Sequence, residues 1–152
     1  MFRVTRAEEQ AVRLTMRLAA DGVQKTLSEL AEGENLPEPT VAKLLGMLRR
    51  GGVVQAVRGR HGGYVLAGTP ADISAGAVIR SVCGDDVFEF PCHDPNETPD
   101  CTRSEDCGLR PVWRHLGEKV SEVLEQTTIA DLLRREATAS RNLQELWPLT
   151  GD

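Results

Sequence analysis

Apolar residues in the first part of the chain recur at the spacing of amphipathic helices, and two of these stretches begin with a recognisable cap. Thr5-x-x-Glu8 is a capping box, in which each side chain bonds the backbone amide of the other residue, and it opens a helix predicted to run to about residue 20. Thr26-x-x-Glu29 is a second box, which opens a short helix that stops near Gly33.

A third helix and a hairpin are predicted next. The helix is marked by apolar residues at spacing i, i+3, i+4 and i+7, namely Val41, Leu44, Leu45 and Leu48. Pro39 falls in its first turn, where a missing amide hydrogen costs little, and Gly51-Gly52 closes it. Residues 53–67 combine strand-forming side chains with a glycine-rich turn, which predicts a two-stranded hairpin.

A short helix, a tight turn, a helix and a hairpin are the outline of a winged helix-turn-helix. We therefore expect a mainly α fold with a small β-hairpin wing, followed by a long dimerisation helix. The third helix would enter the major groove of DNA, and the wing tip would reach the negative channel of a minor groove. The side chains expected at this interface are Thr40, Lys43, Arg49, Arg50, Arg58, Arg60 and His61.

The long helix is predicted over about residues 108–126 and carries one apolar stripe. The stripe consists of Leu109, Val112, Trp113, Leu116, Val120, Val123 and Leu124. A winged domain of this size cannot cover such a face, so we expect a homodimer. Thr128-x-x-Asp131 caps a further short helix. The expected organisation is a DNA-binding domain at 1–68, a short helix and cysteine-bearing loop at 69–107, a dimerisation region at 108–136 and a mobile tail at 137–152.

The net charge of −5 is unusual for a nucleic-acid binder, but it is divided unevenly along the chain. Residues 1–68 carry a net charge of +3 and the rest of the chain carries −8. A basic half can contact phosphates while an acidic half stays away from them, so overall acidity does not exclude double-stranded promoter DNA as a partner.

Several other classes of protein are excluded or disfavoured. No apolar run approaches the roughly 20 residues that span a bilayer, and the start lacks a secretion signal, so we expect a soluble cytoplasmic protein. The glycines of the hairpin are not followed by the Lys and Ser or Thr of a nucleotide loop, and we find no nucleophile, base and orienter of an enzyme.

Three cysteines follow the pattern Cys92-x8-Cys101-x5-Cys107 in a Pro- and Asp-rich loop. A loop has little packing use for three thiols, and in a reducing compartment thiols more often ligate metal than form disulfides. The pattern lacks the paired Cys-x2-4-Cys of common zinc sites, so an iron-sulfur cluster, of two-iron or four-iron type, fits better than zinc. Zinc remains the alternative.

Two segments carry a resemblance to a known family. The segment LSELAEGENLPEPTVAKLLGMLRRGGVVQAVRGRHGGYVLA, and later CGLRPVWRHL followed by TTIADLL, resemble the winged-helix regulators typified by IscR and NsrR. The resemblance runs from about residue 3 to residue 136. It implies a homodimer that binds pseudo-palindromic DNA, with an iron-sulfur cluster held by Cys92, Cys101 and Cys107.

The fourth ligand departs from the family pattern. Arg110 stands where some members carry a ligating histidine, and the first cysteine interval is longer than usual. Other members take a carboxylate from the first helix of the partner subunit, a position that Glu9 matches. The other candidates are Glu8, His93 and Cys83, the last of which we expect to be a buried thiol on a short helix.

The sequence thus predicts a DNA-binding regulator that senses redox state, nitric oxide or iron-sulfur status through its loop cysteines. A zinc- or thiol-based regulator of the same fold is the alternative, and an iron-sulfur electron carrier is a more distant one. Metal and sulfide content would distinguish the zinc- or thiol-based regulator from the cluster-based regulator, and DNA binding would distinguish a regulator from the electron carrier.

Overall fold

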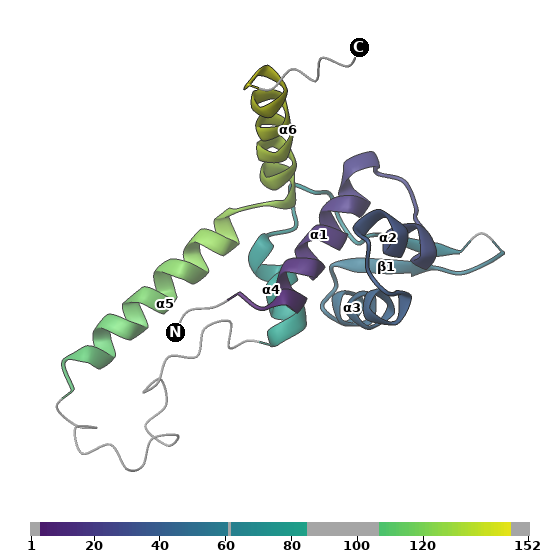
Figure 1. Ribbon diagram of the computed structural model, residues 1–152. Helices are drawn as coiled ribbons and strands as arrows, with labels where there is room; N and C mark the ends of the chain where they lie inside the picture. The colour runs from purple at the N-terminus through teal and green to yellow at the C-terminus, as the bar shows by residue number, and fades with distance from the viewer. Residues whose placement is uncertain (1–3, 61, 85–106, 147–152) are drawn as a thin grey trace.

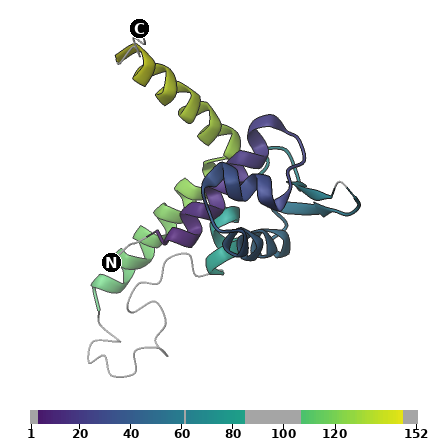
Figure 2. The same ribbon diagram turned by 45° about the vertical axis from the view of Figure 1, so that its right-hand side comes forward.

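The structure is a computed structural model that describes residues 4–60, 62–84 and 107–146. Its elements are α1 (Arg6–Asp21), α2 (Leu27–Glu34), α3 (Glu38–Arg50), β1 (Val54–Val57), β2 (Gly63–Leu66), α4 (Ala75–Cys83), α5 (Leu109–Gln126) and α6 (Ile129–Leu146). Helices α1 to α4 and the hairpin form one body, from which α5 and α6 project in different directions (Figures 1 and 2). The predicted fold class, mainly helical with a β-hairpin wing, is confirmed.

The helix starts lie where the local caps predict them. Thr5 Oγ1 accepts the amide of Glu8, and the Glu8 carboxylate accepts the amide of Thr5 at 2.6 Å. Thr26 and Glu29 form the same reciprocal pair at the start of α2. These bonds satisfy amides that have no partner inside the helix, which explains why the sequence could locate both starts.

Helix α3 begins earlier than its apolar spacing indicates, at Glu38, directly after the N-capping residue Pro37. The hairpin that follows is antiparallel, with Val54 opposite Leu66 and Val57 opposite Gly63.

A backbone bridge from Lys25 to Tyr64 fastens β2 to the segment before α2, through bonds of 3.1 and 2.8 Å. A Cβ at Gly63 would lie 2.5 Å from the Lys25 carbonyl oxygen, so only glycine permits this approach. Strand β2 is therefore held at Tyr64, in the second residue pair from the turn, and the turn projects away from the body (Figure 1).

The hydrophobic core lies between α1, α2, α3 and α4. Its fully buried large side chains are Leu14, Leu18, Leu30, Leu45, Leu48, Ile129, Val41, Val54 and Val78. The four apolar positions that predicted the third helix, Val41, Leu44, Leu45 and Leu48, are all buried, which places the opposite face of α3 toward solvent. Core packing thus determines which side chains of α3 are available to a partner.

Helix α6 is longer than predicted. Thr128 and Asp131 cap it as expected, and Ile129 at its start is completely buried. It then continues to Leu146, although weak periodicity after Glu136 gave no reason to extend a helix there. Ala137, Thr138 and Ala139, which follow Glu136, are all exposed.

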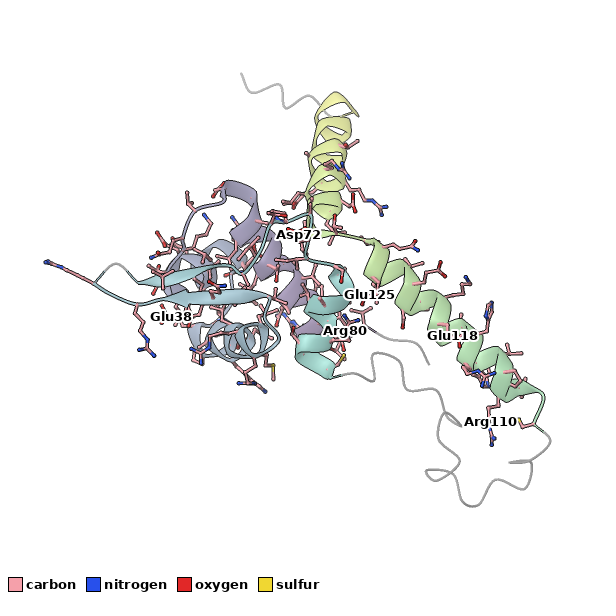
Figure 3. All side chains as sticks on the ribbon, turned by 180° about the vertical axis from the view of Figure 1, so that it is seen from behind. Glu38, Asp72, Arg80, Arg110, Glu118 and Glu125 are labelled. Carbon is pink, nitrogen blue, oxygen red and sulfur yellow. The ribbon has the colours of Figure 1, made fainter. Side chains whose placement is uncertain are left out.

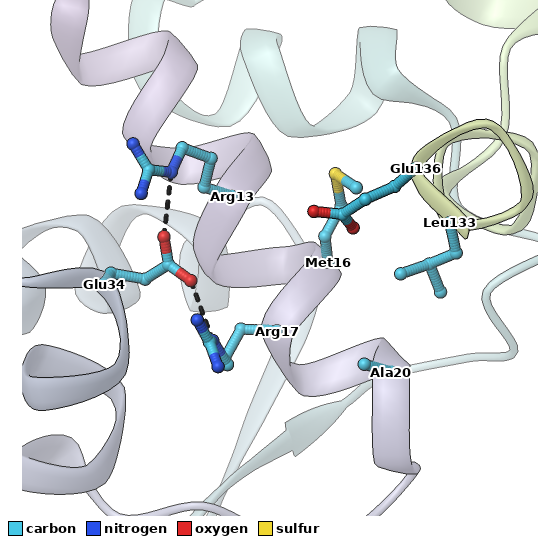
Figure 4. A pocket seen from close by; sticks show the side chains of 7 residues that line it. All are labelled: Arg13, Met16, Arg17, Ala20, Glu34, Leu133 and Glu136. Carbon is cyan, nitrogen blue, oxygen red and sulfur yellow. Dashed lines mark hydrogen bonds and ion pairs between the residues drawn. The ribbon is translucent and has the colours of Figure 1, made fainter. Parts of the chain in front are cut away.

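Helices α1 and α2 are joined by a shared carboxylate. The buried Glu34 accepts from Arg13 Nε and Arg17 Nε, both at 2.8 Å, as Figure 4 shows. A small pocket of about 260 Å³ lies beside this ion triad, between α1 and α6, and Leu133 and Glu136 line its α6 side. Charge-assisted bonds of this kind fix the packing angle of the first two helices.

Candidate DNA-binding surface and cysteine site

The exposed face of α3 presents the predicted DNA contacts at both ends. Lys43 is exposed in the amino-terminal half, and Thr40 is half-buried one turn earlier. Arg49 and Arg50 are exposed in the last turn. Between these ends, Ala42 is exposed and Gly46 has no side chain, while Met47 is half-buried and lines the same groove as Thr40 and Lys43. The sequence prediction did not single out these three residues.

The wing tip presents two exposed arginines, Arg58 and Arg60. Gly59 between them has a backbone φ of +130°, a conformation that residues other than glycine rarely adopt. The Gly62 amide donates a hydrogen bond of 2.9 Å to the Gly59 carbonyl, which closes the turn. The turn therefore directs both arginines away from the body of the protein. His61 lies outside the described residues.

Within the part of the chain that the structure describes, the basic side chains of α3 and the wing form no ion pair with other residues. Within residues 4–60, 62–84 and 107–146, the ion pairs of α1 and α4 involve Arg13, Arg17 and Arg80. The basic side chains predicted to meet DNA form no ion pair in those same ranges; they are Lys43, Arg49, Arg50, Arg58 and Arg60. Uncompensated positive charge on a helix and a neighbouring hairpin is the electrostatic footprint of a nucleic-acid interface.

The cysteine site is only partly within the described residues. Cys107 is half-buried and lies immediately before the start of α5, whereas Cys92, Cys101 and His93 fall outside the described ranges. The amino-terminal end of a helix favours negative charge, so this position suits a thiolate. Cys107 is therefore chemically suited to bind a soft metal, as a ligand of an iron-sulfur cluster must be.

The two carboxylates near the start of α1 have different roles. Glu8 is buried and holds the helix cap through Thr5. Glu9 is exposed, and Arg13 Nη1 lies 3.6 Å from its carboxylate. An exposed carboxylate held only by a surface ion pair can turn toward another subunit, whereas Glu8 would have to abandon its cap. Of the two, Glu9 is the better candidate for a ligand supplied to a partner subunit.

Cys83 is exposed at the end of α4, which corrects the prediction of a buried thiol. Partial burial of its sulfur raises the thiol pKa, and the nearby Glu8 carboxylate raises it further. The thiol lines a groove of about 610 Å³ between α1, α3 and α4. A raised thiol pKa disfavours the thiolate, so Cys83 is less suited than Cys107 to ligate metal.

The apolar stripe of α5 is exposed in the single chain. Leu109, Val112, Leu116 and Val123 are 60, 55, 42 and 62% exposed, and Trp113 is 37% exposed. Helix α5 contributes no buried residue to the body. No helix among the described residues is long and apolar enough to cross a membrane.

Sequence and structural relatives agree with this geometry. A family model, the Rrf2 family, described as an iron-dependent transcriptional regulator, matches residues 4–135. The chain is 36% identical over 107 residues to the HTH-type transcriptional regulator CymR of Bacillus subtilis, which covers 70% of each protein. Among solved structures, it is similar to T. potens IscR, with a TM-score of 0.71, 28% identity, and coverage of 91% of this chain and 90% of the other.

The structure of Bacillus subtilis CymR, called the global cysteine regulator of that organism, is also similar. Its TM-score is 0.69 at 27% identity, with coverage of 89% of this chain and 98% of the other. The matched regions include the winged helix-turn-helix and the long helix that follows it. The chain therefore belongs to the Rrf2 family of DNA-binding transcriptional regulators and is not an enzyme.

Proposed function

We propose that this protein is a homodimeric regulator of transcription whose DNA binding depends on an iron-sulfur cluster. The proposal rests on the separation of two surfaces, which lie on opposite sides of the body of the protein. Basic side chains that form no ion pair with the described residues lie on α3 and the wing. The exposed apolar stripe lies on α5, which projects from the other side of the body, and Cys107 lies just before that helix (Figure 1).

On the DNA side, α3 would occupy the major groove and the wing would follow the adjacent backbone or minor groove. Lys43 is placed for base edges or phosphates, and Arg58 and Arg60 at the wing tip are placed for phosphates or a narrow minor groove. One such unit makes few contacts. Two units related by a twofold axis would read a palindromic site with far higher affinity.

The dimer would form through the α5 stripe. The same patch of each subunit would face the other across the twofold axis, so each apolar side chain is buried twice per dimer. The exposure of this stripe supports a pair of α5 helices as the centre of the assembly.

The proposed cluster ligands are Cys92, Cys101 and Cys107, with Glu9 of the partner subunit as the fourth. When bound, such a cluster supplies a centre that reacts with oxygen, nitric oxide or a change of redox state. Cys107 would hold its thiolate at the start of α5, next to the dimer interface. Glu9 would leave its ion pair with Arg13 and link α1 of one subunit to the loop of the other.

A zinc- or thiol-based regulator is the second candidate, since the matched CymR structure is described as a cysteine regulator and not as a cluster protein. The two candidates differ in what anaerobic purification yields. A cluster protein carries iron and acid-labile sulfide in equal amounts and absorbs visible light, whereas a zinc or thiol regulator does neither.

The test uses the protein purified anaerobically and a duplex that it selects from random-sequence DNA. Replacing Cys101 with alanine should abolish visible absorbance and should make DNA affinity insensitive to nitric oxide. Cys83→Ala is the matched control, because this thiol lies outside the proposed ligand set and should keep both properties. Equal retention of iron and nitric oxide response by Cys101→Ala would reject the proposed function.

A further inference from the structure

Helix α4 is packed between three other helices, and its contact with α5 is made by a cluster of polar side chains. Glu125 of α5 accepts hydrogen bonds from Ser74 Oγ at 2.9 Å and from Arg80, with which it also forms an ion pair. Ser74 in turn caps α4 by accepting the Ala77 amide at 3.0 Å. We call Ser74, Arg80 and Glu125 the α4–α5 clasp; Figure 3 shows Arg80 and Glu125 facing each other.

At the clasp, α4 and the carboxyl-terminal end of α5 are in close contact. A Cβ placed on Gly76 would overlap the Glu125 carboxylate, so a side chain at this position would displace that carboxylate from its bonds with Ser74 and Arg80. A backbone bond from the Ala75 amide to the Thr127 carbonyl, at 2.8 Å, fixes the same junction. The carboxyl-terminal end of α5 therefore has a defined position on the winged domain.

Glu125 lies on the face of α5 opposite to the apolar stripe. Nine residues separate it from Leu116, which is about two and a half turns at 3.6 residues per turn, so the two side chains point in opposite directions. One face of α5 is thus fastened to its own winged domain while the other is exposed to a second subunit.

The other side of α4 contacts the end of the DNA-reading helix. A Cβ on Gly51, the residue that directly follows α3, would lie 2.7 Å from the Ser81 Cβ of α4. Ser81 is itself fixed by a bond to the Ala77 carbonyl at 2.8 Å. A continuous path of close contacts therefore leads from α5, through the clasp and α4, to Gly51 at the end of α3.

We propose that Arg80 and Glu125 are a positioning pair that sets the distance and angle between the two α3 helices of the dimer, and hence the half-site spacing of the DNA that the protein prefers. The inference rests on the proposed function only in requiring a DNA-binding dimer, and it does not require a cluster. Arg80 and Glu125 contact no DNA in this scheme; they act through α4 and α5.

The pair is too exposed to act mainly on global stability. The side chains of Arg80 and Glu125 are 37 and 42% exposed, a setting in which ion pairs contribute little to folding. Arg80 also holds the pKa of Glu125 below its ordinary value, and Ser74 adds to this effect, so the carboxylate stays charged in neutral solution. The orientation of α5 is the property that such a contact controls.

The experiment measures affinity for a series of duplexes. Two copies of the half-site selected by the protein are placed with their centres moved apart by one base pair at a time, and a duplex with one copy serves as the reference. Each added base pair moves the half-sites by about 3.4 Å and rotates one around the duplex, so a rigid dimer should prefer one spacing by about tenfold or more.

Arg80→Glu and Glu125→Arg should each flatten this preference to less than about threefold while leaving affinity for the single half-site unchanged. The double variant that exchanges the two charges should restore the preference. Circular dichroism would detect whether these changes impair folding. In that case Glu125→Gln, which keeps the shape of the side chain, replaces them, and it should give a spacing preference between that of the wild type and the flattened profile.

Two controls separate the clasp from general effects. Exchanging Lys119 and Glu122, an exposed pair within α5 at 2.7 Å, should leave the spacing profile unchanged. Gly76→Ala should flatten the profile, whereas Gly68→Ala should not, because only one atom, Asp72 Cβ at 3.9 Å, would lie within 4 Å of its new Cβ.

A wild-type profile kept by both single charge variants would overturn the positioning role, as would failure of the double variant to restore it. A wild-type protein that stays monomeric or binds no selected duplex would instead contradict the proposed function. The two failures are therefore distinguishable.

Discussion

Replacing Leu116 with alanine should weaken the dimer by about 30-fold. In the single chain this side chain is 42% exposed, and complete burial of a leucine side chain contributes about 1.5–3 kcal/mol, so the remaining exposed part is worth about 1 kcal/mol. A twofold interface buries it twice, which gives about 2 kcal/mol per dimer and a 30-fold change in the dissociation constant.

Sedimentation velocity over a range of protein concentrations measures this constant directly. Glu118→Ala is the matched control, because Glu118 lies on the polar side of the same helix and is exposed (Figure 3). Its dissociation constant should stay within about threefold of the wild-type value, as surface substitutions usually change stability by less than 0.5 kcal/mol. Equal dissociation constants for Leu116→Ala and the wild type would show that the stripe is not the dimer interface.

Three further predictions concern the wing, a helix cap and the ion triad. Arg58→Ala should weaken binding to all duplexes alike and lower the slope of log affinity against log salt by about 1, because one phosphate contact is lost. Fluorescence anisotropy titrations at several salt concentrations measure this slope. The same slope for Arg58→Ala and for the control Arg135→Ala on α6 would contradict the prediction. Asp131 has its pKa lowered to about 2 by the Thr128 amide and hydroxyl, so its stabilising effect is complete above about pH 4 and is lost as the pH falls toward 2. The difference in melting temperature between the wild type and Asp131→Asn should shrink over that interval, and a constant difference would refute the assignment. Glu34→Gln should lower the free energy of unfolding by about 1–3 kcal/mol, since it removes the charge of the buried acceptor that Arg13 and Arg17 share. Urea denaturation showing no larger loss than for the exposed Glu32→Gln would argue against it.

The parts of the fold that sequence reasoning located are those decided by neighbouring residues. The hydroxyls of Thr5, Thr26 and Thr128 each accept a hydrogen bond from the backbone amide three residues later. Four consecutive residues are therefore enough to predict where each of these helices begins. The apolar side of α3 was equally readable, because periodic leucines and a valine mark the face that the core covers.

The parts that were missed depend on contacts between distant segments. Arg80 and Glu125 are 45 positions apart, and nothing near either residue indicates that α4 and α5 meet there. Cys83 follows apolar residues that predicted burial, but it lies at the last position of α4, where the helix leaves the core. The extension of α6 beyond Glu136 had only a weak apolar signal, and the first residues of this part, Ala137, Thr138 and Ala139, are exposed.

The candidate site was predicted unevenly for the same reason. Exposed arginines at a glycine turn are visible in sequence, and the structure places Arg58 and Arg60 at that tip. The capping box already assigned Glu8 to the start of α1 and so favoured Glu9 as the ligand; the structure shows Glu8 bonded to the Thr5 amide and Glu9 in a surface ion pair with Arg13. The ligand role of Cys92, Cys101 and Cys107 stays a prediction.

The most direct test follows the visible absorbance and the DNA affinity of the anaerobically purified wild-type protein together while nitric oxide is added in steps. The proposed function predicts that a visible band is present at the start, that it is lost as nitric oxide is added, and that the affinity for the selected duplex changes in proportion to that loss. A colourless protein that contains no iron, or a band that disappears while the DNA affinity stays constant, would contradict it.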